Sequence, residues 1–206
     1  MDRVPRGASE SEVAGLESSL SQGSEPTDRR GRFGSEIRTL LAWASGLGRL
    51  IDTEQFDQTL GSFEEIRGGQ EHFVFHDSRT DRVLKLTNNR QFGSGIYLSN
   101  YLRNIRLSNL LFADDIRIEG VVKASVPIVV TSQPFVAGRN GTELEIDGFF
   151  LDLGFEKRGA SRYASEELNL SVTDARGANV KVTPSGVLVP IDVQFALLRE
   201  PGDDEL

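Results

Sequence analysis

The sequence predicts an α+β chain with an antiparallel sheet, and three observations support this fold class. Apolar residues recur at helical spacing in three segments, around residues 35–46, 96–112 and 142–154. Two pairs of short β-like segments lie between these helices, and a hairpin follows the last one. The order is therefore helix, strand pair, helix, strand pair, helix, hairpin, which differs from the strand–helix alternation of a parallel sheet.

The N-terminal region is predicted to be a disordered tail over residues 1–34. It is rich in Ser, Gly, Glu and Arg and has few large apolar groups, so it cannot bury enough surface to offset the cost of ordering the chain. A short helix around "SEVAGLESSL" is the structured alternative. A chain that begins at Ser35 is expected to keep nearly all of its stability. Residues 35–200 are predicted to form one domain, followed by an acidic tail at residues 201–206.

The elements of this domain follow from local patterns. Ser35 is the expected N-cap of the first helix, because Ile37, Leu40 and Ala44 follow it at helical spacing. Alternating or β-branched residues then mark the strands, and polar turns or Pro-Gly pairs separate them. The first pair is "EHFVFH" and "DRVLKLT", the second lies within "GVVKASVPIVVTSQPF", and the hairpin is "NVKV" with "VLVPIDV".

Composition excludes several classes of function. The chain has no cysteine, which rules out disulfides, thiolate metal sites and cysteine nucleophiles, and its only histidines are His72 and His76. A net charge of -8 argues against a nucleic-acid partner. No apolar run approaches the ~20 residues of a membrane span, and no signal segment is visible. We therefore expect a cytoplasmic protein with no membrane or nucleic-acid partner.

A group of polar residues surrounds the predicted hairpin. Asp174 and Asn179 lie five positions apart on a loop, and the returning strand leads to Asp192. Mg²⁺ binds a few protein oxygens together with phosphate oxygens, and Asn179 with Asp192 would supply them. Asp174 would then accept a proton from an incoming hydroxyl. The alternative is that Asp174 and Asn179 only shape the turn.

A second group lies in the first strand pair. Gly68 and Gly69 precede a strand, and adjacent glycines let backbone amides approach phosphates closely. Lys85 lies inside an apolar strand, where its charge needs a partner such as a phosphate. The alternatives are that Lys85 is an edge-strand residue reaching water and that His72 and His76 are ordinary strand residues. If the two histidines are not ordinary strand residues, His72 would lie next to a bound phosphate.

These parts, in this order, resemble the protein-kinase fold. More closely, "GGQEH", "NLLFADDIRIEGV", "VVTSQPFVAG" and "VPIDVQ" are similar to the small kinase-like domain of polyvalent proteins of phages and mobile elements, over residues 35–198. The resemblance implies ATP and Mg²⁺ as cofactors and a compact fold with a truncated C-terminal lobe. It implies these site residues: Asp174 and Lys85 as catalytic, Gly68, Gly69, Glu71, His72, Lys85, Gln133, Phe135 and Gly138 as nucleotide-binding, and Asn179 and Asp192 as metal-binding.

The sequence departs from the kinase pattern at three places. Residues 82–113 contain no acid, so Asn104, Asn109 or a glutamate from elsewhere, such as Glu71, would have to orient Lys85. Val172 stands where kinases have histidine, and Val193 and Gln194 follow the metal aspartate. The sequence ends 14 residues after Asp192 (206 minus 192), so no activation segment or helical lobe is expected.

Three functions are consistent with these residues. The first is a Mg²⁺-ATP-dependent phosphotransferase acting on an unknown protein or small-molecule acceptor. The second is a weak or inactive pseudokinase that binds nucleotide and acts through partners. The third is an interaction module that binds no nucleotide and exposes Lys85 at its surface. Keeping Lys85, Asp174, Asn179 and Asp192 together favours the first.

Overall fold

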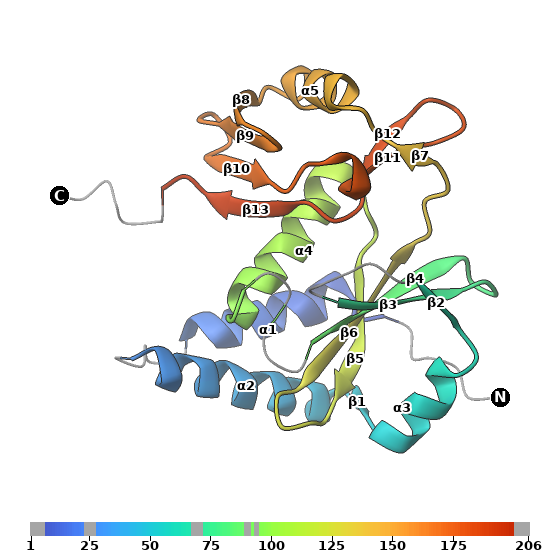
Figure 1. The fold of residues 1–206 in the computed structure, drawn as a ribbon. Coiled ribbons are helices and arrows are strands. Elements are labelled where there is room, and N and C mark those ends of the chain that lie inside the picture. Colours follow the sequence, from blue (N-terminus) through green and yellow to red (C-terminus); the bar gives the residue numbers. More distant parts are fainter. Residues whose placement is uncertain (1–6, 23–27, 67–71, 89–91, 93–94, 200–206) are drawn as a thin grey trace. The chain divides into compact units, whose positions relative to one another are not determined.

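A computed structural model describes residues 7–22, 28–66, 72–88, 92 and 95–199 (Figure 1). The chain divides into two compact units. Unit 1 comprises Met1–Ile105 and Asp115–Phe135, and unit 2 comprises Arg106–Asp114 and Val136–Leu206. The boundary falls within one helix, α4 (Leu98–Phe112), which contributes residues to both.

Unit 1 contains a six-stranded sheet in the order β1-β5-β6-β4-β3-β2. The short β1 pairs parallel with β5, and every other neighbouring pair is antiparallel, as the sequence predicts for the N-terminal sheet. Its strands are β1 (Leu50–Ile51), β2 (Glu64–Ile66), β3 (His72–Asp77), β4 (Arg82–Thr87), β5 (Arg117–Val122) and β6 (Ile128–Pro134).

Helices cover both faces of this sheet. Successive strand residues point to opposite faces, so the buried neighbours Val129 and Val130 belong to different cores. The Val129 face packs on α1 (Glu10–Gln22), α2 (Arg29–Gly46) and the first part of α4. The Val130 face packs on α3 (Thr53–Leu60) through Phe56. Figure 1 shows α1 and α2 on one side of the strands and α3 at the end of the sheet next to β1.

The N-terminal region differs from the predicted disordered tail. Residues 10–22 form α1, the helix that the sequence offered only as an alternative, and its Leu16 is fully buried. The indole Nε1 of Trp43 donates to the carbonyl of Glu12 at 2.9 Å, and the Glu12 carboxylate pairs with buried Arg49 at 3.0 Å. A few apolar residues on one face are enough to form an ordered helix when that face packs against another helix.

The start of α2 also differs from the prediction. The N-cap is Asp28, whose carboxylate accepts from the amide of Gly31 at 2.6 Å, so the helix begins before Ser35. A carboxylate at this position satisfies a backbone donor that has no partner inside the helix. The predicted N-cap, Ser35, is instead an interior residue of α2.

Unit 2 combines one helix with two small sheets. The helix α5 (Glu143–Asp152) starts at Thr142, as expected for the third helix, through a capping box with Glu145. A four-stranded sheet has the order β13-β10-β9-β8, and a three-stranded sheet has the order β12-β11-β7. The strands are β7 (Arg139–Asn140), β8 (Glu156–Gly159), β9 (Arg162–Ser165), β10 (Leu170–Thr173), β11 (Val180–Val182), β12 (Leu188–Pro190) and β13 (Gln194–Leu197).

Aromatic side chains fill the core of unit 2. The rings of buried Phe150 and Tyr163 stack with centroids 4.5 Å apart, and Phe112, at the end of α4, lies 5.7 Å from Phe195. The Tyr163 hydroxyl donates to Asp147 at 2.6 Å, which satisfies its polar end. Taken together, the helices and sheets of the two units make this a mixed α+β protein with a mostly antiparallel N-terminal sheet, and the predicted fold class is confirmed.

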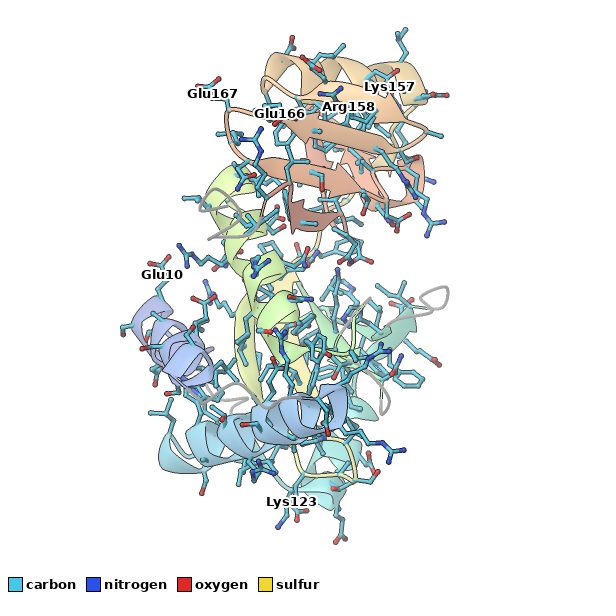
Figure 2. The ribbon with its side chains drawn as sticks, turned by 90° about the vertical axis from the view of Figure 1, so that its left-hand side faces the viewer. Glu10, Lys123, Lys157, Arg158, Glu166 and Glu167 are labelled. Atoms are coloured by element: carbon cyan, nitrogen blue, oxygen red, sulfur yellow. The ribbon has the colours of Figure 1, made fainter. Side chains whose placement is uncertain are left out.

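The outer strand of unit 2 carries charge. All four residues of β8 are exposed, and Lys157 on this strand pairs with Glu143 and Asp147 of α5 at 2.7 and 2.8 Å. Figure 2 shows Lys157, Arg158 and Glu166 near one another at the surface of this unit. Charged side chains on an edge strand discourage pairing with another chain.

Candidate functional site

Lys85 lies in the interior of the unit 1 sheet. Its strand, β4, runs between β3 and β6, and Lys85 is paired with Val74 on one side and Thr131 on the other. Cross-strand partners share a face, so the half-buried Lys85 lies in a row with these two residues. The alternative that Lys85 is an edge-strand lysine is therefore wrong.

The first turn of α4 contacts this row through Tyr101. The Tyr101 hydroxyl lies 3.4 Å from Thr131 Oγ1, which in turn donates to the carbonyl of Lys85 at 3.3 Å. The Tyr101 ring also lies 5.9 Å from the ring of His72, on the neighbouring strand. Sequence reasoning missed Tyr101, although a tyrosine in a helix without any acid was a usable signal.

The two asparagines proposed to orient Lys85 have contacts inside their own helix. The side-chain amide of Asn104 donates to the carbonyl of Asn100 at 3.0 Å. The Asn109 carbonyl accepts from the amide of Ala113 at 3.1 Å. Glu71, together with Gly68 and Gly69, lies outside the described residues. Tyr101 of α4 reaches the Lys85 row through its hydroxyl.

Two residues predicted to bind nucleotide, Gln133 and Phe135, lie at the end of β6. Gln133 is buried and opposite Val83, whose other partner is His76. The His76 ring lies 4.4 Å from that of Phe135, and the exposed Phe135 is anchored by its amide to the carbonyl of Asp81 at 2.9 Å. This row combines apolar and aromatic side chains with one buried amide, and its contact with nucleotide stays a prediction.

In unit 2, Asp174 and Asn179 lie in direct contact. The Asn179 side-chain amide donates to the Asp174 carbonyl at 2.9 Å and to its carboxylate Oδ2 at 2.6 Å. Asn179 is buried and ends a short 3₁₀ turn (Gly177–Asn179), whereas Asp174 has a left-handed backbone with φ 56°. Because both bonds use the nitrogen, the amide oxygen Oδ1 is the atom of Asn179 that can accept a cation.

Arg176 is a residue of this loop that sequence reasoning missed. Its Nε lies 2.9 Å from Asp174 Oδ1, and its backbone amide donates to the Asp174 carbonyl at 2.9 Å. The side chain is 62% exposed, so its guanidinium stays accessible to solvent while it pairs with the acid. An arginine between two candidate acidic and amide residues was the available signal.

The hairpin brings Asp192 back toward this loop. Strands β11 and β12 pair Val180 with Pro190, and the amide of Ile191 donates to the carbonyl of Asn179 at 2.8 Å. Asp192 therefore follows directly on a residue bonded to Asn179, as the sequence predicts for the hairpin. Its role as a metal ligand stays a prediction.

The donor set suits Mg²⁺ rather than a metal held by the protein alone. The described residues contain no cluster of three or more His, Cys, Asp or Glu side chains that could hold a metal ion. Asn179 and Asp192 provide one amide oxygen and one carboxylate, which are hard oxygen ligands. Mg²⁺ keeps water and takes phosphate oxygens in such partial sites, so these residues fit it.

Gly138 has a packing role in unit 2. A Cβ at this position would collide with the carbonyl oxygen of Val182 on β11. Gly177 is similar, because a Cβ there would collide with the carbonyl oxygen of Gly141. The absence of a side chain at Gly138 thus allows two backbone segments to approach closely, and its predicted contact with nucleotide stays a prediction.

The departures around Asp174 and Asp192 correspond to core positions. Val172, in place of a histidine, is fully buried in the unit 2 core, and Val193 is buried in the same cluster. Gln194 starts β13, which pairs with β10 immediately before the Asp174 loop. The segment after Asp192 therefore enters the four-stranded sheet as β13.

Comparison with known proteins identifies the family. Residues 35–199 match the family model described as a serine/threonine/tyrosine kinase found in polyvalent proteins. The chain belongs to this family. The match confirms the resemblance drawn from the sequence, and α1 lies outside the matched residues. No curated protein matches the chain.

The family supports a kinase-like function for the chain. Among the helices in the described parts, none has the length and apolar character needed to cross a bilayer.

Proposed function

We propose that this kinase-like domain is a Mg²⁺-ATP-dependent phosphotransferase that acts on a hydroxyl acceptor. The observation that carries the proposal is the paired geometry of Asp174 and Asn179, whose side chains bond through the Asn179 nitrogen. This arrangement leaves the Asn179 oxygen for a cation and fixes the neighbouring carboxylate.

Asp174 is the proposed base. Each carboxylate oxygen has two lone-pair sites, so Asp174 can accept another proton donor while it bonds Arg176 and Asn179. The acceptor oxygen forms its bond to the γ-phosphorus of ATP as the bond from that phosphorus to the β–γ bridging oxygen breaks. ADP leaves, and the hydroxyl proton passes to Asp174.

The other residues bind and orient. Lys85, in the interior strand β4, would pair with the phosphates through its positive charge. His72, Gln133, Phe135 and Gly138 would contact the nucleotide, as would Gly68, Gly69 and Glu71. Mg²⁺, held by Asn179 and Asp192, would neutralise charge on the phosphates when bound.

A pseudokinase that binds nucleotide without transfer is the second candidate. The absence of an acid on α4 and the ion pair between Asp174 and Arg176 favour it. Both candidates predict binding, and they differ in whether Asp174 performs chemistry.

The test combines binding with transfer. With nucleotide at about 100 times its dissociation constant, Mg²⁺-ATP should stabilise the fold by roughly 2.7 kcal/mol, and EDTA should remove most of that gain. Asp174→Asn should bind ATP as before but lose a factor of roughly 10² or more in transfer of labelled γ-phosphate. Binding without transfer in both proteins selects the pseudokinase, and no binding at all contradicts both candidates.

A further inference from the structure

The first turn of α4 is held by an acid from another helix. Glu36 of α2 is buried, and its carboxylate accepts from the backbone amide of Leu98 at 2.6 Å and from the Ser99 hydroxyl at 2.8 Å. The amides of a helix's first turn have no partner inside the helix, and its positive end favours an anion. Glu36 therefore caps α4 from α2, and Figure 1 shows α4 beginning beside α2.

Arg32 strengthens the same junction. Its guanidinium lies 4.2 Å from the centre of the Tyr97 ring, donates to Ser99 Oγ at 3.2 Å and lies 3.5 Å from the Glu36 carboxylate. The charge of buried Glu36 is thus balanced by a cation as well as by the helix end. We call Arg32, Glu36, Tyr97, Leu98 and Ser99 the α2–α4 clamp.

The clamp lies close to the Lys85 row. Tyr101 bonds through its backbone amide to the carbonyl of Tyr97 at 3.3 Å, so it belongs to the turn that Glu36 caps. The hydroxyl of the same residue lies against Thr131, the cross-strand partner of Lys85. A shift of the first turn of α4 would move Tyr101 relative to this row.

We infer that Glu36 is a positioning residue for nucleotide binding, which acts through Tyr101. Since α4 has no acid of its own, its placement over the Lys85 row depends on an acid supplied from α2. The inference rests on the proposed function, because it concerns how Lys85 meets the phosphates. It assigns α2 a role in the site although α2 carries none of the predicted site residues.

The test measures ATP affinity by calorimetry below the melting temperature of every variant. Glu36→Ala should weaken ATP binding about tenfold, within the range usual for coupling between sites. Glu36→Gln keeps the shape and one acceptor oxygen and should recover part of the affinity. If Glu36→Ala does not fold, the comparison of wild type with Glu36→Gln carries the test.

A matched control is Glu145→Ala in unit 2. Glu145 also bonds a backbone amide and a hydroxyl at a helix start, both on Thr142 at 2.9 Å. This variant should lose thermal stability but bind ATP as the wild type does. An equal loss of affinity in both variants would show a general effect of instability and overturn the inference.

A double-mutant cycle tests the route through Tyr101. Tyr101→Phe keeps the ring beside His72 and removes the hydroxyl, and Glu36→Ala should have a smaller effect on affinity in this background. Full additivity would contradict a route through Tyr101. Unchanged affinity in Glu36→Ala would overturn the inference and leave the proposed function standing, whereas a wild type that binds no ATP would overturn both.

Discussion

The candidate residues of unit 1 and unit 2 are held in place by different means. Lys85, Gln133 and their neighbours lie on strands whose register fixes which residues share a face. Asp174 and Asn179 lie on a loop, where bonds between the two side chains set their orientation. The strand residues thus depend on the core beneath the sheet, and the loop residues depend on one another.

This difference predicts how substitutions will affect the candidate residues of each unit. A strand position tolerates the loss of a side chain that does not pack, because neighbouring strands keep the backbone in place. A loop position held by side-chain bonds loses its geometry with the side chain. The same contrast separates residues whose change affects only ligand binding from those whose change also affects folding.

The largest expected effect comes from the core of unit 1. Leu16→Ala removes a fully buried side chain from α1 and should cost about 2–5 kcal/mol in the free energy of unfolding, measured with urea. Leu144→Ala on α5, where the side chain is 82% exposed, should change it by less than about 0.5 kcal/mol. If Leu16→Ala cost as little as Leu144→Ala, α1 would not be part of the folded core, and the disordered tail predicted from the sequence would be correct.

A smaller effect should distinguish the two halves directly. Asn179→Ala removes both bonds to Asp174 and should cost about 1–2 kcal/mol without ligand, because the half-buried acceptors of Asp174 lose the donor that holds them in place. Lys85→Met should leave the ligand-free protein within about 1 kcal/mol of wild type and abolish stabilisation by Mg²⁺-ATP. Thermal melting with and without nucleotide measures both. If Lys85→Met destabilises the ligand-free protein more than Asn179→Ala does, the comparison fails.

The smallest effect concerns pH and has opposite signs in the two units. Burial raises the pKa of Glu119 in unit 1, so its contribution to stability is present below the ordinary glutamate value of about 4.3 and is lost as pH rises through the raised value. Hydrogen bonds from Lys157 and then Tyr163 lower the pKa of Asp147 in unit 2. Its contribution is present above the ordinary aspartate value of about 3.9 and is lost as pH falls through the lowered value.

Melting curves between pH 3 and 8 test this contrast. The melting temperature of Glu119→Gln should rise relative to that of the wild type as pH rises, since the amide avoids the cost of a buried charge. Asp147→Asn should be weaker than wild type at neutral pH and approach it in acid. Slopes of the same sign would show that burial does not dominate at Glu119.

Much of the fold followed from patterns in the sequence, and the exceptions have physical causes. The strands around Lys85 and the hairpin before Asp192 were predicted because their apolar residues alternate and polar turns bound them. The helix α1 was not, because Leu16 is buried only when α2 supplies a partner surface. Strands β8, β9 and β13 are only four residues long, too short for a clear alternation, so pairing rather than composition defines them.

The candidate site divides in the same way. Asp174, Asn179 and Asp192 were recognisable by residue type and spacing. Arg176 gave a signal only through its place between Asp174 and Asn179, and its 2.9 Å contact with Asp174 came from the structure. Glu36 gave none, because its 2.6 Å bond to the amide of Leu98 is encoded by no local pattern. Contacts between residues 62 positions apart depend on how helices pack.

The left-handed backbone at Asp174 has a consequence for reading natural variation. Only glycine, asparagine and aspartate adopt φ near 56° readily, and other residues pay roughly 1–2 kcal/mol there. Replacing Asp174 with glutamate would preserve the charge but strain the backbone at this position. Replacing it with asparagine would remove the charge without straining the backbone. Chemical similarity is therefore a poor guide to tolerance at this position, where the backbone restricts the choice before the reaction does.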